Sequence, residues 1–152
     1  MKFRILIFLI LNFSALIAGV SLYGEGGNSE WYNNLTKAPW EPPGWVFGAA
    51  WTIIMICFAF YMSITWKYTV MKKKLIFLYV LQLILNIFWN PIFFNLHYIF
   101  LGLTTILILT ILIAYILHLF WNEVKVNSIL ILPYLIWLLI ATSLNGYIFF
   151  KN

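Results

Sequence analysis

Four stretches of the chain contain no Asp, Glu, Lys or Arg. They run from Ile5 to Gly24, from Pro42 to Trp66, from Leu75 to Asn122 and from Val126 to Phe150. A membrane-spanning helix needs about 20 mainly apolar residues. Each shorter stretch therefore fits one helix, and the third fits two, with a break near residues 95–97. The pattern predicts an all-α protein whose five transmembrane helices form one bundle.

We expect the spans at about residues 5–23, 44–66, 75–96, 99–121 and 128–150, in a single domain that covers residues 1–152. The connections between the spans are too short to hold a separate soluble domain. Residues 24–43 form the longest connection, and loops of this length in compact bundles usually have a function.

Composition supports the membrane assignment. Hydrophobic residues make up 64% of the chain and charged residues 9%, whereas soluble domains average about half and about a quarter. These values exclude an ordinary soluble domain and indicate a multi-pass integral membrane protein. The net charge of +5 is explained by orientation in the membrane and does not indicate a nucleic-acid partner.

Seven of the nine basic residues fall on one side of the predicted bundle. They precede the first span or lie in the second and fourth loops, whereas Lys37 and Lys151 fall on the other side. Since Lys and Arg accumulate in cytoplasmic loops, we expect the N-terminus inside and the C-terminus outside. Basic loops such as Lys67 to Lys74 also attract anionic lipid, although topology alone accounts for this one.

The first span resembles a secretory signal, because Lys2 and Arg4 precede an apolar run. A cleavage site needs small residues at both the −3 and the −1 position. The sequence Leu16-Ile17-Ala18 supplies a small residue at one of them. We therefore expect this helix to be retained as a span.

Residues 31–51, WYNNLTKAPWEPPGWVFGAAW, contain four of the eight tryptophans and three of the five prolines. Pro39, Pro42 and Pro43 fix their own φ angles and disfavour helix in the residues before them. We predict an ordered, non-helical loop up to Gly44, where a helix begins. An interfacial aromatic belt explains one or two tryptophans. Four of them beside a Pro-Pro turn favour a lid over a cavity.

Two later spans carry polar and aromatic residues at helical spacing. The third has Gln82, Asn86 and Trp89 along one face, and the fifth has Trp137, Ala141 and Asn145. An unpaired amide in lipid is costly, so these faces point into the bundle. The amides there either bond between helices or line a pocket.

The depth of each ring in the membrane follows from the helical rise of about 1.5 Å per residue. By this rise, Trp51 and Trp89 lie about 10 Å below the outer ends of their spans and Trp137 about 20 Å below. The three rings and the face from Gln82 to Asn86 can then line one cavity that opens outward beneath the lid. An apolar, aromatic cavity with few polar anchors suits a flat hydrophobic ligand.

The sequence contains no Ser-His-Asp set, metal-ligand cluster, paired carboxylates or phosphate-binding loop. His118 is a candidate haem ligand, but His97 belongs to the opposite membrane face, so no second histidine shares its depth. We expect no bound metal and no cofactor. Hydrolytic, metal and phosphoryl-transfer chemistry are therefore not expected, which leaves redox chemistry or photochemistry of tryptophan.

Three motifs in one order resemble the translocator protein family, also called tryptophan-rich sensory proteins. The first comprises Trp31-Tyr32, Leu35, Lys37, Trp40, Pro42-Pro43, Trp45-Val46-Phe47 and Trp51; the second is QLILNIFWNPIFF, from Gln82 to Phe94; the third is PYLIW, ending at Trp137, with Ala141 and Leu144-Asn145. The family binds porphyrins, other tetrapyrroles, steroids and synthetic lipophiles. The resemblance implies a receptor or sensor for porphyrin, haem or a similar flat lipophile, with transport as a further role.

Carried over residue by residue, the resemblance implies a ligand pocket. It comprises Trp51, Asn86, Trp89, Trp137 and Ala141, with Tyr32 and Pro42 from the lid. The resemblance also implies a homodimer. Some bacterial members are proposed to degrade protoporphyrin in light, so the alternative is a light-dependent porphyrin-degrading enzyme that uses Trp51 and Trp137. A structural subunit of a larger membrane assembly is the third class.

The sequence departs from the family at several positions. Ala38 and Met55 stand where a proline and a tyrosine are common in the family. Thr104 and Thr105 stand about where many members have an acidic residue. This last difference argues against an ion or proton role for the fourth span.

Overall fold

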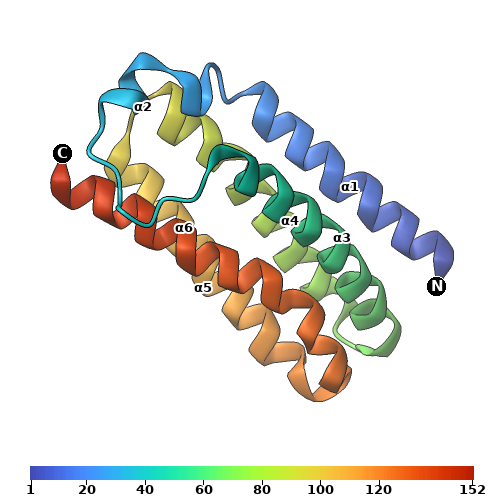
Figure 1. Ribbon diagram of the computed structural model, residues 1–152. Helices are drawn as coiled ribbons and strands as arrows, with labels where there is room; N and C mark the ends of the chain where they lie inside the picture. The colour runs from blue at the N-terminus through green and yellow to red at the C-terminus, as the bar shows by residue number, and fades with distance from the viewer.

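The computed structural model describes all 152 residues, and every regular element is a helix. The long helices run alongside one another (Figure 1): α1 (Lys2–Ser21), α3 (Gly44–Tyr68), α4 (Lys72–Asn90), α5 (Ile99–Val124) and α6 (Leu132–Lys151). Shorter elements connect them: η1 (Gly26–Asn28), α2 (Glu30–Asn34), η2 (Pro91–Asn95) and η3 (Lys125–Ile131). The predicted all-α class is confirmed.

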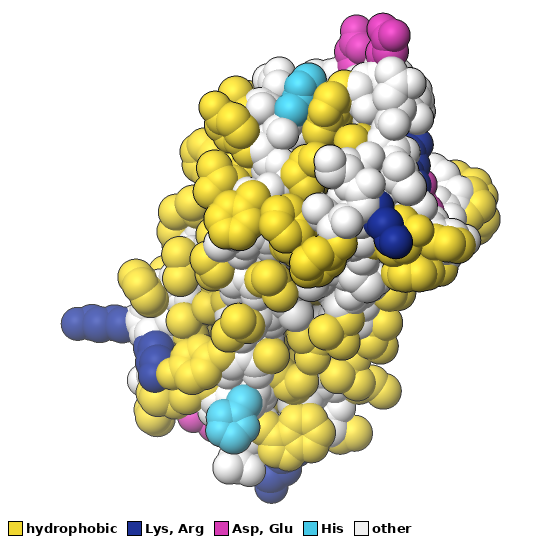
Figure 2. All heavy atoms as spheres, turned by 90° about the vertical axis from the view of Figure 1, so that its left-hand side faces the viewer, with side chains coloured by type: hydrophobic (Ala, Val, Ile, Leu, Met, Phe, Trp, Pro, Cys, Tyr) yellow, Lys and Arg dark blue, Asp and Glu magenta, His cyan; other side chains and the backbone are white.

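Four segments are long and apolar enough to cross a membrane, namely Lys2–Asn28, Gly44–Tyr68, Lys72–Asn95 and Ile99–Lys151. The last is 53 residues long and contains both α5 and α6, joined by η3. On the face drawn in Figure 2, hydrophobic side chains cover most of the surface between the two ends of the molecule. Such an extensive apolar surface is typical of contact with lipid.

The long helices close into a ring in the order α1, α3, α6, α5 and α4, in which each helix packs against the next and α4 returns to α1. Although α3 and α4 are consecutive in the chain, they do not pack closely against each other. Asn12 of α1 joins them: its Nδ2 donates to the Met55 carbonyl of α3 (2.9 Å), and its Oδ1 accepts from the Tyr79 hydroxyl of α4 (2.7 Å). Buried polar groups in a bilayer must be paired internally, so these bonds fix α1 between the two helices.

An aromatic core fills the half of the bundle that lies away from residues 24–43. The Phe58 ring centroid lies 5.3 Å from that of Tyr134 and 6.0 Å from those of Tyr61 and Tyr79. All four side chains are almost completely buried. Each such ring pair stabilises packing by about 0.5–1.5 kcal/mol beyond the area that it buries. This core packs α3, α4 and α6 together in one half of the bundle.

The two helix boundaries that differ most from the prediction both lie next to a proline. The last α-helix begins at Leu132 rather than residue 128, with Pro133 in its first turn, where the missing N–H breaks no helical bond. Residues 125–131 instead form the 3₁₀ helix η3. The α-helical part of the third span ends at Asn90, and a π-helical turn follows from Pro91 to Asn95.

The prediction of a wholly non-helical loop before Gly44 is wrong over its first part. The helix α2 spans Glu30–Asn34, and the hydroxyl of its N-cap Ser29 accepts a bond from the Tyr32 amide (3.1 Å). An N-cap serine and a glutamate in the first turn both favour a helix start. The prolines restrict themselves and their preceding residues, so they leave this upstream turn free. Residues 35–43 are non-helical, and α3 begins at Gly44 as predicted.

Candidate functional site

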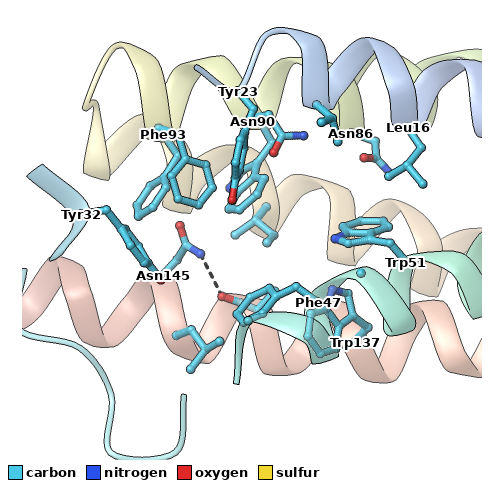
Figure 3. A pocket seen from close by; sticks show the side chains of 18 of the residues that line it. Leu16, Tyr23, Tyr32, Phe47, Trp51, Asn86, Asn90, Phe93, Trp137 and Asn145 are labelled. Atoms are coloured by element: carbon cyan, nitrogen blue, oxygen red, sulfur yellow. Dashed lines mark hydrogen bonds between the residues drawn. The ribbon is translucent and has the colours of Figure 1, made fainter. Parts of the chain in front are cut away.

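A cavity of about 390 Å³ lies between the helices, on the side of the aromatic core that faces residues 24–43, here called the lid. Its walls come from α1, α3, α4, η2, α6 and, through Ile106, α5, and Tyr32 reaches it from the lid (Figure 3). The volume falls within the range of small-molecule sites, about 300–1,000 Å³. Exposed Val20 of α1 and Gly48 of α3 line it too, so the cavity reaches the surface between these helices as well as beneath the lid.

Trp51 and Trp137 lie close together at one end of the cavity (Figure 3). Trp51 packs edge-on against Tyr134, with 5.9 Å between ring centroids, and Trp137 packs edge-on against Phe47 at 5.3 Å. These contacts fix the two indoles by the edge-to-face geometry that aromatic pairs prefer. The helices α3 and α6 thus each contribute one rigid ring to this wall.

Trp89 and Phe93 belong to the other end of the cavity, beside the lid. Their rings stack at 5.6 Å with 7° between planes, and Phe93 also meets Trp31 and Tyr32 of the lid edge-on. Phe93 lies in the π-helical turn η2 and is almost completely buried. A Cβ on Gly102 of α5 would stand 2.9 Å from the Phe93 ring. Because Gly102 has no side chain, α5 leaves room for the Phe93 ring.

Two buried polar atoms of residues that line the cavity have no hydrogen-bond partner: the indole Nε1 of Trp89 and the Oδ1 of Asn145. Asn145 is 4% exposed, and its Nδ2 is already engaged by the Ala141 carbonyl at 3.1 Å (Figure 3). Leaving a buried polar group unpaired costs about 1–3 kcal/mol. Trp89 and Asn145 line the cavity, but each unpaired atom is itself covered, so the side chain must turn before a bound molecule can pair with it.

The predicted polar face of α4 has two different roles. Asn86 lines the cavity and also donates from Nδ2 to the Tyr134 hydroxyl (2.8 Å). Gln82 does not line it; its Oε1 accepts from the same hydroxyl at 2.9 Å. The expectation that the cavity wall extends to Gln82 is therefore wrong, because Tyr134 of α6 covers this amide. Hydrogen bonding between helices and cavity lining both occur on this face.

Pro42 does not line the main cavity. It borders a more polar hollow of about 450 Å³ under the lid, which also includes Lys37 and Glu41 and shares Tyr32 with the main cavity. The Tyr32 hydroxyl donates to Glu41 Oε1, and burial together with this bond raises the pKa of Tyr32 well above its ordinary range. The Lys37 Nζ lies 4.3 Å from the centre of the Tyr32 ring. The cavity thus has a charged vestibule.

The lid is held to the bundle on two sides. On one side Trp31 stacks on His97, with 4.1 Å between ring centroids and 15° between planes. On the other, Trp40 Nε1 donates to the Ser143 hydroxyl of α6 at 3.1 Å, and its ring meets Tyr147 edge-on at 5.4 Å. These contacts come from tryptophans that do not line the cavity. Their role in the structure is to position the lid.

Six of the seven predicted pocket residues therefore border the same cavity: Tyr32, Trp51, Asn86, Trp89, Trp137 and Ala141. Sequence reasoning missed the contribution of α1, through Leu16, Val20 and the following Tyr23. An apolar helix without a polar stripe gives no signal for such a role. Phe93 and Phe94 were visible as part of the QLILNIFWNPIFF motif, but their inward position depends on the π-helical turn.

Other predicted features lie outside the cavity. His118 is exposed on α5, and the structure brings no three His, Cys, Asp or Glu side chains together as a metal site. The hydroxyls of Thr104 and Thr105 bond to the carbonyls of Phe100 and Leu101 within α5. Both hydroxyls donate within their own helix, and neither threonine lines the cavity.

The sequence matches the TspO/MBR family model over residues 6–150. The chain belongs to the TspO/MBR family. A tryptophan-rich sensory protein of Cereibacter sphaeroides is 33% identical over 80 residues, covering 53% of this chain and 50% of the relative. The translocator protein of Homo sapiens is 36% identical over 78 residues, covering 49% and 45%. The chain thus spans about half the length of these relatives.

A further TspO/MBR relative is matched over a longer region. The tryptophan-rich protein TspO of Archaeoglobus fulgidus is 31% identical over 112 residues, covering 67% of this chain and 72% of the relative. Family membership confirms the resemblance inferred from the three motifs. It agrees with the apolar helices in identifying a membrane protein.

Proposed function

We propose that this TspO/MBR protein is a membrane receptor or sensor that binds a tetrapyrrole, such as a porphyrin or haem, or a similar flat lipophile, and that transport of this ligand is a further role. The observation that carries the proposal is the placement of Trp51, Trp89 and Trp137 around one cavity. Indole faces stack on flat conjugated molecules, with about 1 kcal/mol per contact. Three of them on different walls favour a planar ligand over a flexible one.

The unpaired polar atoms support the same class of ligand. Asn145 Oδ1 and Trp89 Nε1 are buried atoms of cavity residues and have no partner, and polar substituents at the rim of a porphyrin or another flat lipophile can pair with them once these side chains turn towards the ligand. An entirely hydrocarbon ligand would leave both atoms unpaired at a cost of about 1–3 kcal/mol each. A flat molecule with a few polar atoms is therefore the better fit.

The vestibule favours a ligand with an acidic edge. Lys37 is the one basic residue that lines it, and the Glu41 carboxylate beside it is engaged by the Tyr32 hydroxyl. Porphyrins and haem carry carboxylates on one side of a flat hydrophobic ring. With the ring in the main cavity, these carboxylates would extend under the lid towards Lys37.

We also propose that all five long helices cross the bilayer, with the N-terminus inside. The helices α5 and α6 lie within one apolar segment of 53 residues, long enough for two spans. Seven of the nine basic residues lie at the end of the bundle away from the lid. This distribution supports the proposal that the lid and its vestibule lie on the outer side.

Titration of the purified protein with protoporphyrin tests the proposal through quenching of tryptophan fluorescence. We expect saturable quenching at micromolar concentration. Lys37→Gln should weaken protoporphyrin binding about fivefold, the effect of losing an ionic contact of about 1 kcal/mol, and should leave binding of the dimethyl ester unchanged. Lys151→Gln, on α6, is the matched control and should affect neither ligand. Absence of saturable quenching by porphyrins, haem and steroids would overturn the proposal.

A second candidate function is light-dependent degradation of the bound porphyrin. One observation favours it: Trp51 and Trp137, the two indoles that this reaction would use, lie together at the same end of the cavity. Neither ring has a histidine or carboxylate beside it among the residues that line the cavity. Binding therefore stays the primary proposal.

A further inference from the structure

A second apolar groove lies between α1 and α4, at the end of the bundle away from the lid. Its volume is about 400 Å³. Its two long walls are Ile7, Phe8 and Leu11 of α1, and Tyr79, Val80 and Leu83 of α4. These positions recur at intervals of three and four residues, so each set forms a continuous stripe on its helix. From Phe3 to Leu11 the groove extends about 12 Å along α1, at about 1.5 Å per residue.

The walls of this groove present carbon atoms along their length. Tyr79 is the one tyrosine among them, and its hydroxyl points away, donating to the buried Asn12 Oδ1 at 2.7 Å. Its ring packs edge-on against Phe8, with 5.2 Å between centroids. The groove therefore gives a hydrocarbon chain an apolar bed, with no polar group that the chain would leave unpaired.

The mouth of the groove is cationic. Arg4 lines it, and so does Trp66, at the end of α3. The Lys72 Nζ lies 5.5 Å from the centre of the Trp66 ring, so a second cation stands at the same mouth. Three of the four acidic residues belong to the lid, at the opposite end of the bundle. Glu123 is therefore the one carboxylate side chain at the end where this groove lies. Tryptophan is also the residue that settles at the level of lipid headgroups.

We propose that this groove is a binding site for one anionic glycerophospholipid, whose acyl chain lies between α1 and α4 and whose phosphate is bound by Arg4 and Lys72. Lipid tails are as apolar as the groove, so an acyl chain alone gains little by leaving the bulk bilayer. Selection must come from the headgroup, and the two cations at the mouth supply it. The site is separate from the ligand cavity, because no residue lines both.

Native mass spectrometry of the delipidated protein tests this proposal. The protein is titrated with phosphatidylglycerol and with phosphatidylcholine of the same acyl chains. We expect one phosphatidylglycerol to be retained in preference to phosphatidylcholine. In Arg4→Gln/Lys72→Gln the preference should fall about fivefold per cation removed, the free energy of a basic residue beside anionic lipid.

The matched control is Lys67→Gln/Lys74→Gln, which removes two charges from the same end of the bundle. Their ammonium groups lie over Tyr68 and Tyr115, neither of which lines the groove. This variant should keep the preference for phosphatidylglycerol. Equal loss in both double variants would show that the whole basic surface attracts lipid, and it would overturn the site. Equal retention of both lipids by the unchanged protein would do the same.

A second pair of variants tests whether the acyl chain lies in the groove between α1 and α4. Val80→Trp should fill the groove and lower occupancy by both lipids, whereas Phe77→Trp, on the exposed face of α4 outside the groove, should not. Both proteins are first checked for an unchanged helical circular dichroism spectrum. If Val80→Trp retains one phosphatidylglycerol as the unchanged protein does, the groove does not hold the chain. Porphyrin titration should be unaffected in all these variants, so the outcome is independent of the proposed function.

Discussion

At the scale of single residues, Trp51 and Trp137 separate binding from degradation. Phenylalanine keeps much of the aromatic contact of each residue and removes the readily oxidised indole. If the protein binds and does not degrade, Trp51→Phe and Trp137→Phe should each weaken porphyrin binding by about 1 kcal/mol. Bleaching of bound porphyrin under illumination should then be equal in all variants. The measurements are a dark fluorescence titration and the loss of porphyrin absorbance in light.

A different result would support the degradation alternative. In that case the light-dependent loss of absorbance would collapse in both variants while binding in the dark survived. The chain places no metal site beside these rings, and the hydroxyl of Tyr134, whose ring packs against Trp51, is engaged with Gln82 and Asn86. Because no metal site or free tyrosine hydroxyl lies beside the two indoles, we expect the variants to lose some affinity and to bleach bound porphyrin as the unchanged protein does.

Gly48 allows the cavity to be blocked without disturbing the bundle. It lines the cavity, and a Cβ built on it would meet no atom within 4 Å. Gly48→Leu should therefore leave the thermal unfolding temperature unchanged or higher and abolish quenching by protoporphyrin. Gly146→Leu on α6 is the control, because Gly146 has equally open surroundings but does not line the cavity. Unchanged porphyrin affinity in Gly48→Leu would place the ligand elsewhere.

At the scale of elements, the lid is tied to α6 by one hydrogen bond whose loss should be visible in kinetics. Ser143→Ala removes the acceptor of Trp40 Nε1, a bond of about 1 kcal/mol. If the closed lid retains the ligand, porphyrin should dissociate about fivefold faster as measured by stopped-flow fluorescence. Thr104→Ala, which removes a hydroxyl bonded within α5, should dissociate at the original rate. An unchanged rate in Ser143→Ala would mean that the lid does not gate release.

At the scale of the whole molecule, the arrangement in the membrane gives a direct prediction. Five spans place the C-terminus and the connection between α3 and α4 on opposite sides of the bilayer. Reporter fusions at Asn152 and at residues 69–71 should therefore report opposite compartments, with the second reporter cytoplasmic because of its basic neighbours. Reporters on the same side would exclude five spans.

Much of this architecture could be predicted from the sequence. The uncharged stretches predicted the long helices, because a charged side chain within a bilayer is costly and apolar runs of this length have few other uses. Helical spacing predicted that Asn86, Trp89 and Trp137 face the interior. The three motifs predicted the family. All of these signals are local, since each depends on residue type and on spacing along one segment.

The sequence by itself thus determined the helices, their apolar and polar faces and the family. Tertiary structure alone decided how those faces meet. The order of the ring, in which α1 separates α3 from α4, depends on Asn12 bonding to both at once. Whether Gln82 would be covered depends on where Tyr134 arrives from α6. Such pairings join residues that are far apart in sequence, and spacing along one helix carries no information about the partner on another.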